Sequence, residues 1–379
     1  MTITCKAAVL RKIGAPSPYA ESKPLSIETI TLDPPKATDL VVKVLGAGLC
    51  HSDLSVIDGA RPVPLPMAMG HEGAGEVVEV GSAVTDIKVG DPVVFQFSVS
   101  CGRCKSCLSG RGNICDAAPA ARAAGELISG GSRIKDAEGN TVRHHTGVSC
   151  FAEYAVVNRG SVVKVDKDLN MTDAAVFGCA VMTGVGAVLN TARVVPGESV
   201  AVFGLGGVGL CGVMGAKAVG ADTIIGIDME DHKLAKAREL GATHTFNAAD
   251  PDLVEKVRDL TQGGVDHAVE LAGAVPAMKT AFAITARGGR ITTGGLSPAG
   301  AEFGFEHADL VTNEKAILGS YMGSCVPTRD IPRYIAMYRN GQLPVDSLMD
   351  GIVSLEEINA GFDRLAAGTA LRQILAPHG

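Results

Sequence analysis

The chain has 379 residues, which is more than one hydrophobic core usually supports, so we expect two domains. A hydrophobic share of 46% with 20% charged residues is typical of a globular protein. The formal net charge of -7 and the lack of basic runs argue against a nucleic-acid partner. No apolar stretch has the length of a membrane span and the amino terminus lacks a secretion-signal pattern, so we expect a cytoplasmic protein that does not engage a membrane.

The first 180 residues predict a mostly-β domain. Short β-branched runs are separated by Gly, Pro and Asp, as in DLVVKVLGAG (39–48), GEVVEVGSAV (75–84), GDPVVFQF (90–97) and FAEYAVVN (151–158). This spacing favours a barrel-like or sandwich-like arrangement.

Four of the ten cysteines lie within one short segment, CGRCKSCLSGRGNIC: Cys101, Cys104, Cys107 and Cys115. Disulfides are rare in the cytoplasm, so clustered cysteines there indicate metal binding or catalysis. Four thiolates in one lobe are typical of a closed, structural zinc site that leaves no position for substrate. A redox thiol cluster and an iron–sulfur site are the competing interpretations.

From about residue 190 the pattern changes to apolar strands that alternate with helices. Strands are predicted at 199–209, 221–230, 265–273 and 290–296, with helices at 210–221, 231–242, 251–264 and 276–289. This alternation predicts a doubly wound α/β domain with a parallel sheet. Helical patterns also occur at 329–341 and 354–368.

A G-x-G-x-x-G motif, formed by Gly204, Gly206 and Gly209, follows the first of these strands and opens a helix. Such a turn lets the backbone approach a pyrophosphate at the helix amino terminus. Asp228 closes the next strand, where a carboxylate can bind the adenosine ribose, and no Arg follows it within three residues. NAD is therefore favoured over NADP. The alternative is a glycine-rich turn without a ligand.

A second metal site is possible but dispersed. Cys50 follows a Val-rich strand, His71 lies in GHEGAG, and Cys179 lies in FGCAVMTG. Two thiolates and one imidazole would leave a fourth zinc position open, which is the catalytic pattern. Spacing alone does not establish this trio, because single Cys and His residues also occur as buried structural residues.

The motifs GLCHSD, GHEGAGEVVEVG, CGRCKSC, GCAVMTGVGA and AVFGLGGVGL occur in an order that resembles the zinc-containing medium-chain alcohol dehydrogenases over essentially the whole chain. The resemblance implies a GroES-like catalytic domain, residues 1–180 completed by 324–379, and an inserted NAD-binding Rossmann domain, residues 181–323. It also implies two zinc ions per chain, one catalytic and one structural, and hydride transfer from an alcohol to NAD.

The resemblance also assigns roles to residues. Cys50, His71 and Cys179 match the catalytic zinc ligands, and Glu72 matches a residue that either contacts these ligands or serves as an alternative ligand. Asp53 matches the carboxylate that orients His71, and Ser52 the hydroxyl that takes the substrate proton. The matching cofactor-binding residues are His51, Thr183, Gly204, Gly206, Gly207, Val208, Gly209, Asp228, Lys233 and Arg372.

One position departs from the family pattern: Ser55 stands where many members have a His that completes a proton relay. The relay therefore ends on His51 or water, or the proton leaves by another route. The segment after Cys115 resembles the long loop of dimeric members, so we expect a homodimer. His144 and His145 in this segment are interpreted as part of a polar loop, although His145 also aligns with the substrate pocket, as Phe97 does.

The substrate is the open question. The favoured interpretation is an NAD-dependent alcohol dehydrogenase that acts on a primary or secondary alcohol, aromatic alcohols included. The alternatives are an S-(hydroxymethyl)glutathione (formaldehyde) dehydrogenase, a polyol dehydrogenase, a nicotinoprotein that retains its NAD, and a non-catalytic binding or structural protein on the same fold.

Overall fold

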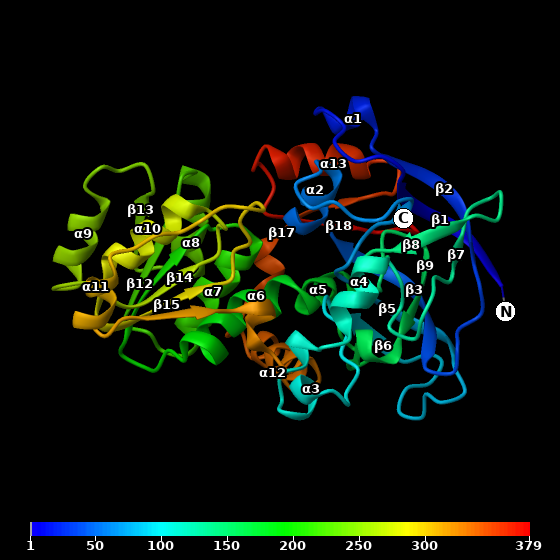
Figure 1. The fold of residues 1–379 in the computed structure, drawn as a ribbon, viewed down its shortest axis with the longest axis horizontal. Coiled ribbons are helices and arrows are strands. Elements are labelled where there is room, and N and C mark those ends of the chain that lie inside the picture. The colour runs from blue at the N-terminus through cyan, green and yellow to red at the C-terminus, as the bar shows by residue number, and fades with distance from the viewer. Residues whose placement is uncertain (1) are drawn as a thin grey trace. The chain divides into compact units, whose positions relative to one another are not determined.

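The computed structural model describes residues 2–379 and divides the chain into two compact units (Figure 1). The first unit contains the residues up to Cys179, with Val326–Pro332 and Met349–Gly379. The second contains Ala180–Cys325 and Arg333–Leu348. The second unit is thus inserted into the first in sequence, as the resemblance implied.

The first unit is built from a small closed barrel and a larger sheet, which confirms the mostly-β, GroES-like prediction. The barrel strands are, in order, β1 (Ile3–Leu10), β2 (Leu25–Leu32), β7 (Ile134–Lys135), β8 (Thr141–His144) and β4 (Met67–Ala68). The sheet strands are, in order, β10 (Val162–Lys164), β6 (Pro92–Phe95), β5 (Gly73–Val80), β3 (Asp39–Gly48), β18 (Arg372–Leu375) and β17 (Met349–Val353), with β9 (Tyr154–Asn158) also paired to β3.

The strand β3 is the centre of this unit. It pairs with β5, β9 and β18, and eight of its ten residues are buried. Burial of a Val or Leu side chain contributes about 2 kcal/mol, so this Val-rich strand accounts for much of the core. The helices of the unit are short: α1 (Tyr19–Ser22), α2 (His51–Ile57), α3 (Lys105–Leu108), α4 (Ala118–Ala124), α5 (Met171–Ala174) and α13 (Ile358–Ala366).

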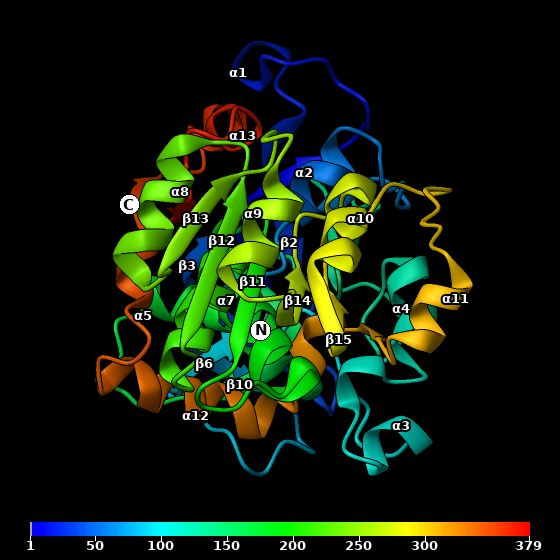
Figure 2. The ribbon, with the colours of Figure 1, turned by 90° about the vertical axis from the view of Figure 1, so that its left-hand side faces the viewer.

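The second unit is the predicted doubly wound α/β domain. Its sheet is entirely parallel, in the order β13 (His244–Asn247), β12 (Thr223–Asp228), β11 (Ser199–Phe203), β14 (Val265–Glu270), β15 (Thr285–Thr293) and β16 (Ala316–Gly319). This is the Rossmann strand order. Figure 2 shows helices on both faces: α7 (Gly207–Ala218), α8 (Asp231–Leu240), α9 (Leu253–Leu260) and α10 (Val275–Ile284).

Three local features of this sheet differ from the prediction. The sequence did not predict the edge strands β13 and β16, because these strands are only partly buried and carry no long apolar run. The predicted helix over 276–289 ends at Ile284, where β15 begins. The residues that follow, Ala286–Gly289, are a register irregularity in that strand rather than helix.

The carboxyl-terminal boundary also differs from the predicted domains. All of 324–379 was expected with the catalytic domain, but Ser324, Cys325 and residues 333–348 lie in the second unit. Tyr334, in α12 (Pro327–Arg339), is fully buried, and its hydroxyl accepts a hydrogen bond from Asn190 Nδ2 at 3.2 Å. This buried contact ties the carboxyl half of α12 to the second unit.

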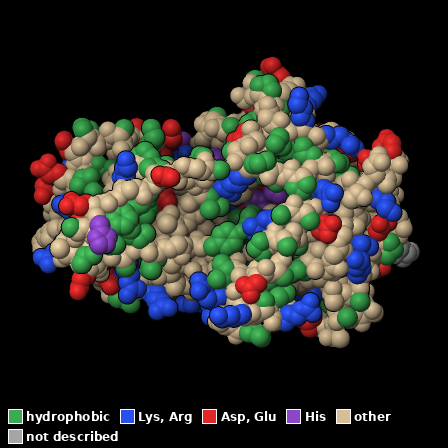
Figure 3. All heavy atoms as spheres, in the orientation of Figure 1, with side chains coloured by type: hydrophobic (Ala, Val, Ile, Leu, Met, Phe, Trp, Pro, Cys, Tyr) green, Lys and Arg blue, Asp and Glu red, His purple; other side chains and the backbone are tan. Residues whose placement is uncertain are grey.

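On the face in Figure 3, Lys and Arg side chains are interspersed with Asp and Glu. Among residues 2–379, no single helix is long and apolar enough to cross a membrane. One bent pair of helical segments in the described residues has the length and apolar composition of a membrane span when the two are taken together: Met171–Gly178 and Ala180–Ala192.

Candidate functional site

Strand pairing brings Cys50 and His71 together although 21 positions separate them in sequence. The antiparallel register of β3 and β5 places Ala47 opposite Gly73, and Gly48 N donates a hydrogen bond to Glu72 O at 2.9 Å. Cys50 follows the end of β3, and His71 precedes the start of β5. Both side chains therefore leave the sheet at the same edge.

Two further segments complete this edge. The strand β18 pairs with β3 so that Ile374 faces Gly48, which places Arg372 beside Leu49. A short helix, η3 (Ala175–Gly178), ends against β6, where a Cβ on Gly178 would lie 1.6 Å from Phe95 O. Only glycine allows this approach, and it positions the next residue, Cys179.

The four residues at this edge form a compact donor set. One ligating atom from each of Cys50, His71, Glu72 and Cys179 lies within 4.8 Å of the others, and all four residues are buried. His71 Nε2 is buried and makes no hydrogen bond. An orphaned imidazole nitrogen beside two sulfurs is costly unless a metal ion satisfies it, so these residues fit a zinc ion.

The two thiols of this set are not equivalent. The pKa of Cys50 lies well below its ordinary value, chiefly because it accepts a hydrogen bond from Cys179. The same hydrogen bond, together with burial, raises the pKa of Cys179. Two thiolates at this separation require a cation, which is what a bound zinc ion supplies.

Asp53 holds two of the presumed ligands at once. Its Oδ1 lies 2.8 Å from His71 Nδ1, and its Oδ2 accepts a hydrogen bond from the backbone N–H of Cys50 at 3.2 Å. Burial lowers the pKa of His71, but the Asp53 carboxylate outweighs it and the pKa rises to about 10. The carboxylate favours a proton on Nδ1, which leaves Nε2 for a metal.

Glu72 and Arg372 form a buried ion pair next to the cluster. Arg372 Nη2 lies 2.9 Å from Glu72 Oε1 and 2.8 Å from Oε2, and Nη1 donates to Leu49 O at 2.9 Å. A Cβ at Gly48 would lie 3.0 Å from Glu72 Oε2, so glycine makes room for this side chain. The Arg372 guanidinium is engaged by Glu72 and by Leu49 O. Its contact with a cofactor phosphate stays a prediction.

His51, Ser52 and Ser55 lie on α2, directly after Cys50. His51 is exposed and Ser52 is partly exposed. Ser55 Oγ donates a hydrogen bond to His51 O at 2.9 Å, one helical turn earlier. Ser55, the residue that departs from the family pattern, therefore makes a local contact with the backbone of its own helix.

His144 and His145 do not form the polar loop that the sequence suggested, since both side chains are buried. His144 is the last residue of β8, and burial, with Arg133 nearby, lowers its pKa to about 3. His145 Nδ1 lies 3.2 Å from Asp53 Oδ1. The parallel pairing of β8 with β4 explains this placement, because β4 leads directly to His71.

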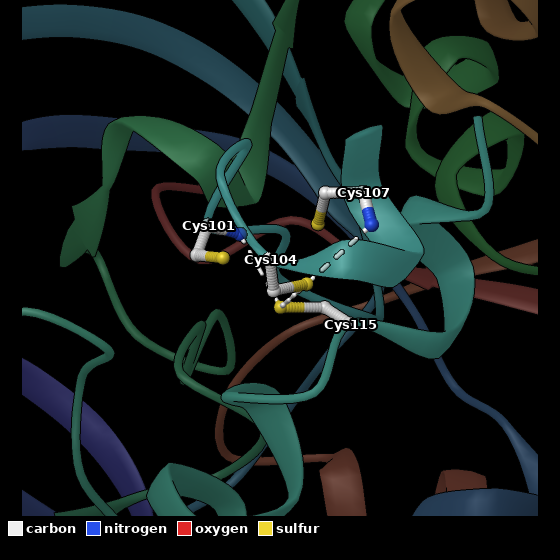
Figure 4. Close-up of side chains that lie close together, drawn as sticks. All are labelled: Cys101, Cys104, Cys107 and Cys115. Atoms are coloured by element: carbon white, nitrogen blue, oxygen red, sulfur yellow. Dashed lines mark hydrogen bonds between the residues drawn. The ribbon is translucent and has the colours of Figure 1, made fainter. Parts of the chain in front are cut away.

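The cysteine lobe folds around α3. One ligating atom from each of Cys101, Cys104, Cys107 and Cys115 lies within 4.8 Å of the others, and Figure 4 shows the four side chains gathered around one small space. Backbone N–H groups point at the sulfurs: Cys101 N lies 3.4 Å from Cys115 Sγ, and Cys107 N lies 3.4 Å from Cys104 Sγ. Such contacts stabilise thiolates.

The thiols of the lobe also need a cation. The backbone N–H of Arg103 lowers the pKa of Cys101 to about 7, whereas burial and the neighbouring sulfurs raise the pKa of Cys107 to about 12. Four thiols this close cannot all ionise unaided. The donor set therefore fits a closed zinc site.

In the second unit the three glycines of the motif have three different environments. Gly204 has φ +81°, which favours glycine, and lies against Ala272. A Cβ on Gly209 would lie 1.8 Å from Gly204 O, so glycine lets α7 approach β11. A Cβ on Gly206 would meet nothing within 4 Å. That open space suits a dinucleotide pyrophosphate at the start of α7.

Asp228 lies at the end of β12, as predicted, and is fixed by backbone groups. Its Oδ2 accepts a hydrogen bond from Leu205 N at 2.6 Å, and its Oδ1 from Glu230 N at 3.0 Å. Lys233 Nζ lies 3.9 Å from Asp228 Oδ1. The glycine turn, the acid and the lysine therefore gather at one edge of the sheet. Thr183, in α6 (Ala180–Gly186), is buried against Met322.

Comparison with known proteins places both units in one family. Residues 36–167 match the alcohol dehydrogenase GroES-like domain, and residues 207–340 match the zinc-binding dehydrogenase family. The S-(hydroxymethyl)glutathione dehydrogenase of Paracoccus denitrificans is 37% identical over 362 residues, which cover 93% of this chain and 96% of that protein.

Solved structures agree over the full length. An alcohol dehydrogenase zinc-binding domain protein from Burkholderia ambifaria has a TM-score of 0.94 at 36% identity, with 99% of each chain covered. Benzyl alcohol dehydrogenase from Acinetobacter calcoaceticus has a TM-score of 0.89 at 33% identity, also with 99% of each chain covered. The chain therefore belongs to the zinc-containing medium-chain alcohol dehydrogenase family.

Proposed function

We propose that this protein is an NAD-dependent zinc alcohol dehydrogenase that interconverts a primary or secondary alcohol, aromatic alcohols included, with its aldehyde or ketone. The observation that carries the proposal is the buried Cys50–His71–Cys179 set, in which His71 Nε2 lacks a partner and Asp53 holds Nδ1. Three such ligands leave a coordination position for substrate, unlike the four-cysteine lobe.

Each group at this edge has a distinct task. Cys50, His71 and Cys179 would hold a zinc ion, which would supply Lewis-acid polarisation of the alcohol or carbonyl oxygen. Asp53 fixes the His71 ring and the Cys50 backbone, so both ligands keep one orientation. We assign to Ser52 the acceptance of the substrate proton, and to His51, or to water, its onward transfer. Ser55 takes no part, because its hydroxyl is directed to His51 O.

NAD is the proposed hydride acceptor. The open space at Gly206 accommodates the pyrophosphate, and the Asp228 carboxylate would repel a ribose 2′-phosphate while accepting hydrogen bonds from free ribose hydroxyls. The cofactor choice needs a direct test, because a putative zinc-binding dehydrogenase from Sinorhizobium meliloti 1021, 28% identical over 99% of this chain, was solved bound to NADP. Two zinc ions per chain and a homodimer complete the proposal.

A coupled screen tests this function. Primary, secondary and aromatic alcohols are offered with NAD or NADP, with and without glutathione, and reduced cofactor is followed by absorbance. We expect turnover of at least one alcohol class with NAD, weaker activity with NADP, and about two zinc ions per chain by metal analysis. Absence of NAD-coupled turnover in a sample that holds both zinc ions would contradict the proposal.

The second candidate is S-(hydroxymethyl)glutathione dehydrogenase, favoured by the relative of that name at 37% identity. It predicts that formaldehyde is oxidised only when glutathione is present. Simple alcohols would then be poor substrates at any concentration. The glutathione arms of the same screen therefore separate the two candidates.

A further inference from the structure

The left-handed turn, residues 320–324, follows β16 and has a strained backbone. Three consecutive residues in it have positive φ: Met322 at +52°, Gly323 at +64° and Ser324 at +50°. Glycine adopts this conformation easily, but a residue with a Cβ does so only at a cost in free energy. Two of the three residues are therefore strained, and such a turn persists only where its surroundings hold it.

Two adjacent residues, Asn190 and Thr191, hydrogen-bond to this turn and are called the clamp below. Asn190 Nδ2 donates a hydrogen bond to Gly323 O at 3.2 Å. Thr191 Oγ1 lies 2.8 Å from Ser320 Oγ and donates to Ser324 Oγ at 2.9 Å. The clamp thus contacts the start, the middle and the end of the left-handed turn.

The clamp has a fixed position of its own. Asn190 and Thr191 belong to η4 (Ala187–Ala192), a π-helix that directly follows α6. Asn190 Nδ2 also donates to the hydroxyl of the fully buried Tyr334, at 3.2 Å. A π-helical turn is rare and occurs frequently at functional sites, which makes the task of these two residues worth asking about.

The left-handed turn packs tightly against α6. A Cβ on Gly186 would lie 2.6 Å from Gly323 O, and a Cβ on Gly323 would lie 2.1 Å from Met182 O, so this approach requires both glycines. Thr183 Oγ1 lies 3.8 Å from Met322 Sδ, and both side chains are buried. The turn therefore forms part of the immediate surroundings of Thr183.

The topology of the sheet relates this turn to the dinucleotide. Ser320 N donates a hydrogen bond to O of Thr293, the last residue of β15, at 2.8 Å, so the turn lies at the carboxyl end of the parallel sheet. Asp228 closes β12, in the half of the sheet formed by β11 to β13, whereas the turn belongs to the half formed by β14 to β16. Each half of a Rossmann sheet takes one nucleotide of the cofactor. With the adenosine at Asp228, the turn is on the nicotinamide side.

We propose that Asn190, together with Thr191, is a positioning residue that holds the left-handed turn in place, so that the turn and Thr183 present a preformed surface to the nicotinamide half of the cofactor. This inference rests on the proposed function, because it takes NAD as the ligand. Without the clamp, the turn would have to be ordered when the cofactor binds, and that cost would weaken binding. The adenosine half contacts the glycine motif and Asp228 instead, so it should not depend on the clamp.

Calorimetric titration with NADH and with ADP-ribose tests the clamp, because ADP-ribose is the cofactor without its nicotinamide. We expect Asn190→Ala to raise the Kd for NADH about 5- to 20-fold, as the loss of two hydrogen bonds would, and the Kd for ADP-ribose less than about twofold. Asn190→Asp keeps the shape of the side chain but lacks the N–H donors. It should therefore weaken NADH binding at least as much as Asn190→Ala.

Thr191→Val is a second, independent variant, which keeps the side-chain shape and removes the hydroxyl. We expect a rise of about 2- to 10-fold in the Kd for NADH and little change for ADP-ribose. This variant decides the question if the Asn190 variants do not fold. The matched control is Asn340→Ala, which removes an exposed asparagine of the same unit and should change neither Kd.

Three results would overturn the proposal. One is an equal weakening of NADH and ADP-ribose binding in the clamp variants, because the loss would then reflect general destabilisation of the unit. Another is NADH binding of wild-type strength to Asn190→Asp, because the shape of the side chain would then matter and its donors would not. The third is unchanged NADH binding in every folded clamp variant.

Failure of the proposed function is distinguishable from failure of the clamp. If the alcohol screen detects no turnover but wild type binds NADH, the proposed activity fails, and the comparison of NADH with ADP-ribose still decides on the clamp. If wild type binds neither NADH nor ADP-ribose, both the proposed cofactor and the clamp are overturned.

Discussion

The two cysteine-containing clusters differ in how they are assembled. The lobe of Cys101, Cys104, Cys107 and Cys115 comes from one short segment, and three of its four residues are partly exposed. The buried set takes Cys50, His71 and Cys179 from three separate parts of the chain. Local spacing assembles the first, whereas strand register assembles the second.

This difference has a chemical consequence. The lobe offers four sulfurs, enough to saturate a tetrahedral ion, so a zinc ion held there would have a structural role. The buried set supplies three such ligands, with Glu72 drawn toward Arg372 by an ion pair. A zinc ion held by the buried set would keep a position for substrate, and Asp53 orients its ligand His71.

The largest effect is expected from Cys179→Ser in the buried set. Loss of a ligand should remove one zinc ion per chain and lower kcat/KM for the best alcohol by about a thousandfold or more, because Lewis-acid assistance contributes several kcal/mol. Metal analysis measures the zinc content, and steady-state kinetics measure kcat/KM. Cys325→Ser, at a buried cysteine outside both clusters, should keep two zinc ions and near-normal activity. Equal activity of the two variants would remove the catalytic assignment.

A smaller effect of a different kind is expected from Cys107→Ser in the lobe. One zinc ion should again be lost, but the free energy of unfolding should fall by about 3 kcal/mol, while the molecules that stay folded retain kcat. Denaturant unfolding and activity per folded molecule are the measurements. Leu108→Ala, on the same short helix and 75% exposed, serves as the control. A loss of kcat at full stability would contradict the structural assignment.

The smallest effect is expected from Asp53→Asn. The amide can still accept a hydrogen bond from His71 Nδ1–H but carries no charge, so zinc affinity of the buried set should fall about 10- to 100-fold while the lobe keeps its metal. Competition with a chromophoric chelator measures the affinity. Asp58→Asn, at the exposed end of the same helix, should not change it. Zinc loss from both clusters together would show a general folding defect instead.

Sequence patterns predicted the features that depend on residues close together in the chain. The doubly wound domain, the position of Asp228 at a strand end and the cysteine lobe follow from periodicity and from short spacings, and the structure has all three. The two edge strands β13 and β16 were missed because they are short and partly exposed. The place of residues 333–348 was missed because it depends on a buried tertiary contact of Tyr334.

The sequence by itself determined which residue types are present and which of them lie close along the chain, including the glycine motif and the four cysteines. The proximity of Cys50, His71 and Cys179 was suggested only by resemblance, as was a place for His145 in the substrate pocket, and the burial of His144 had no signal in the sequence. These arrangements are decided by the registers of β3 with β5 and β18, by the pairing of β8 with β4 and by the close contact at Gly178. Strand pairing joins residues that are remote in sequence, and no local pattern records which remote partner a strand will take.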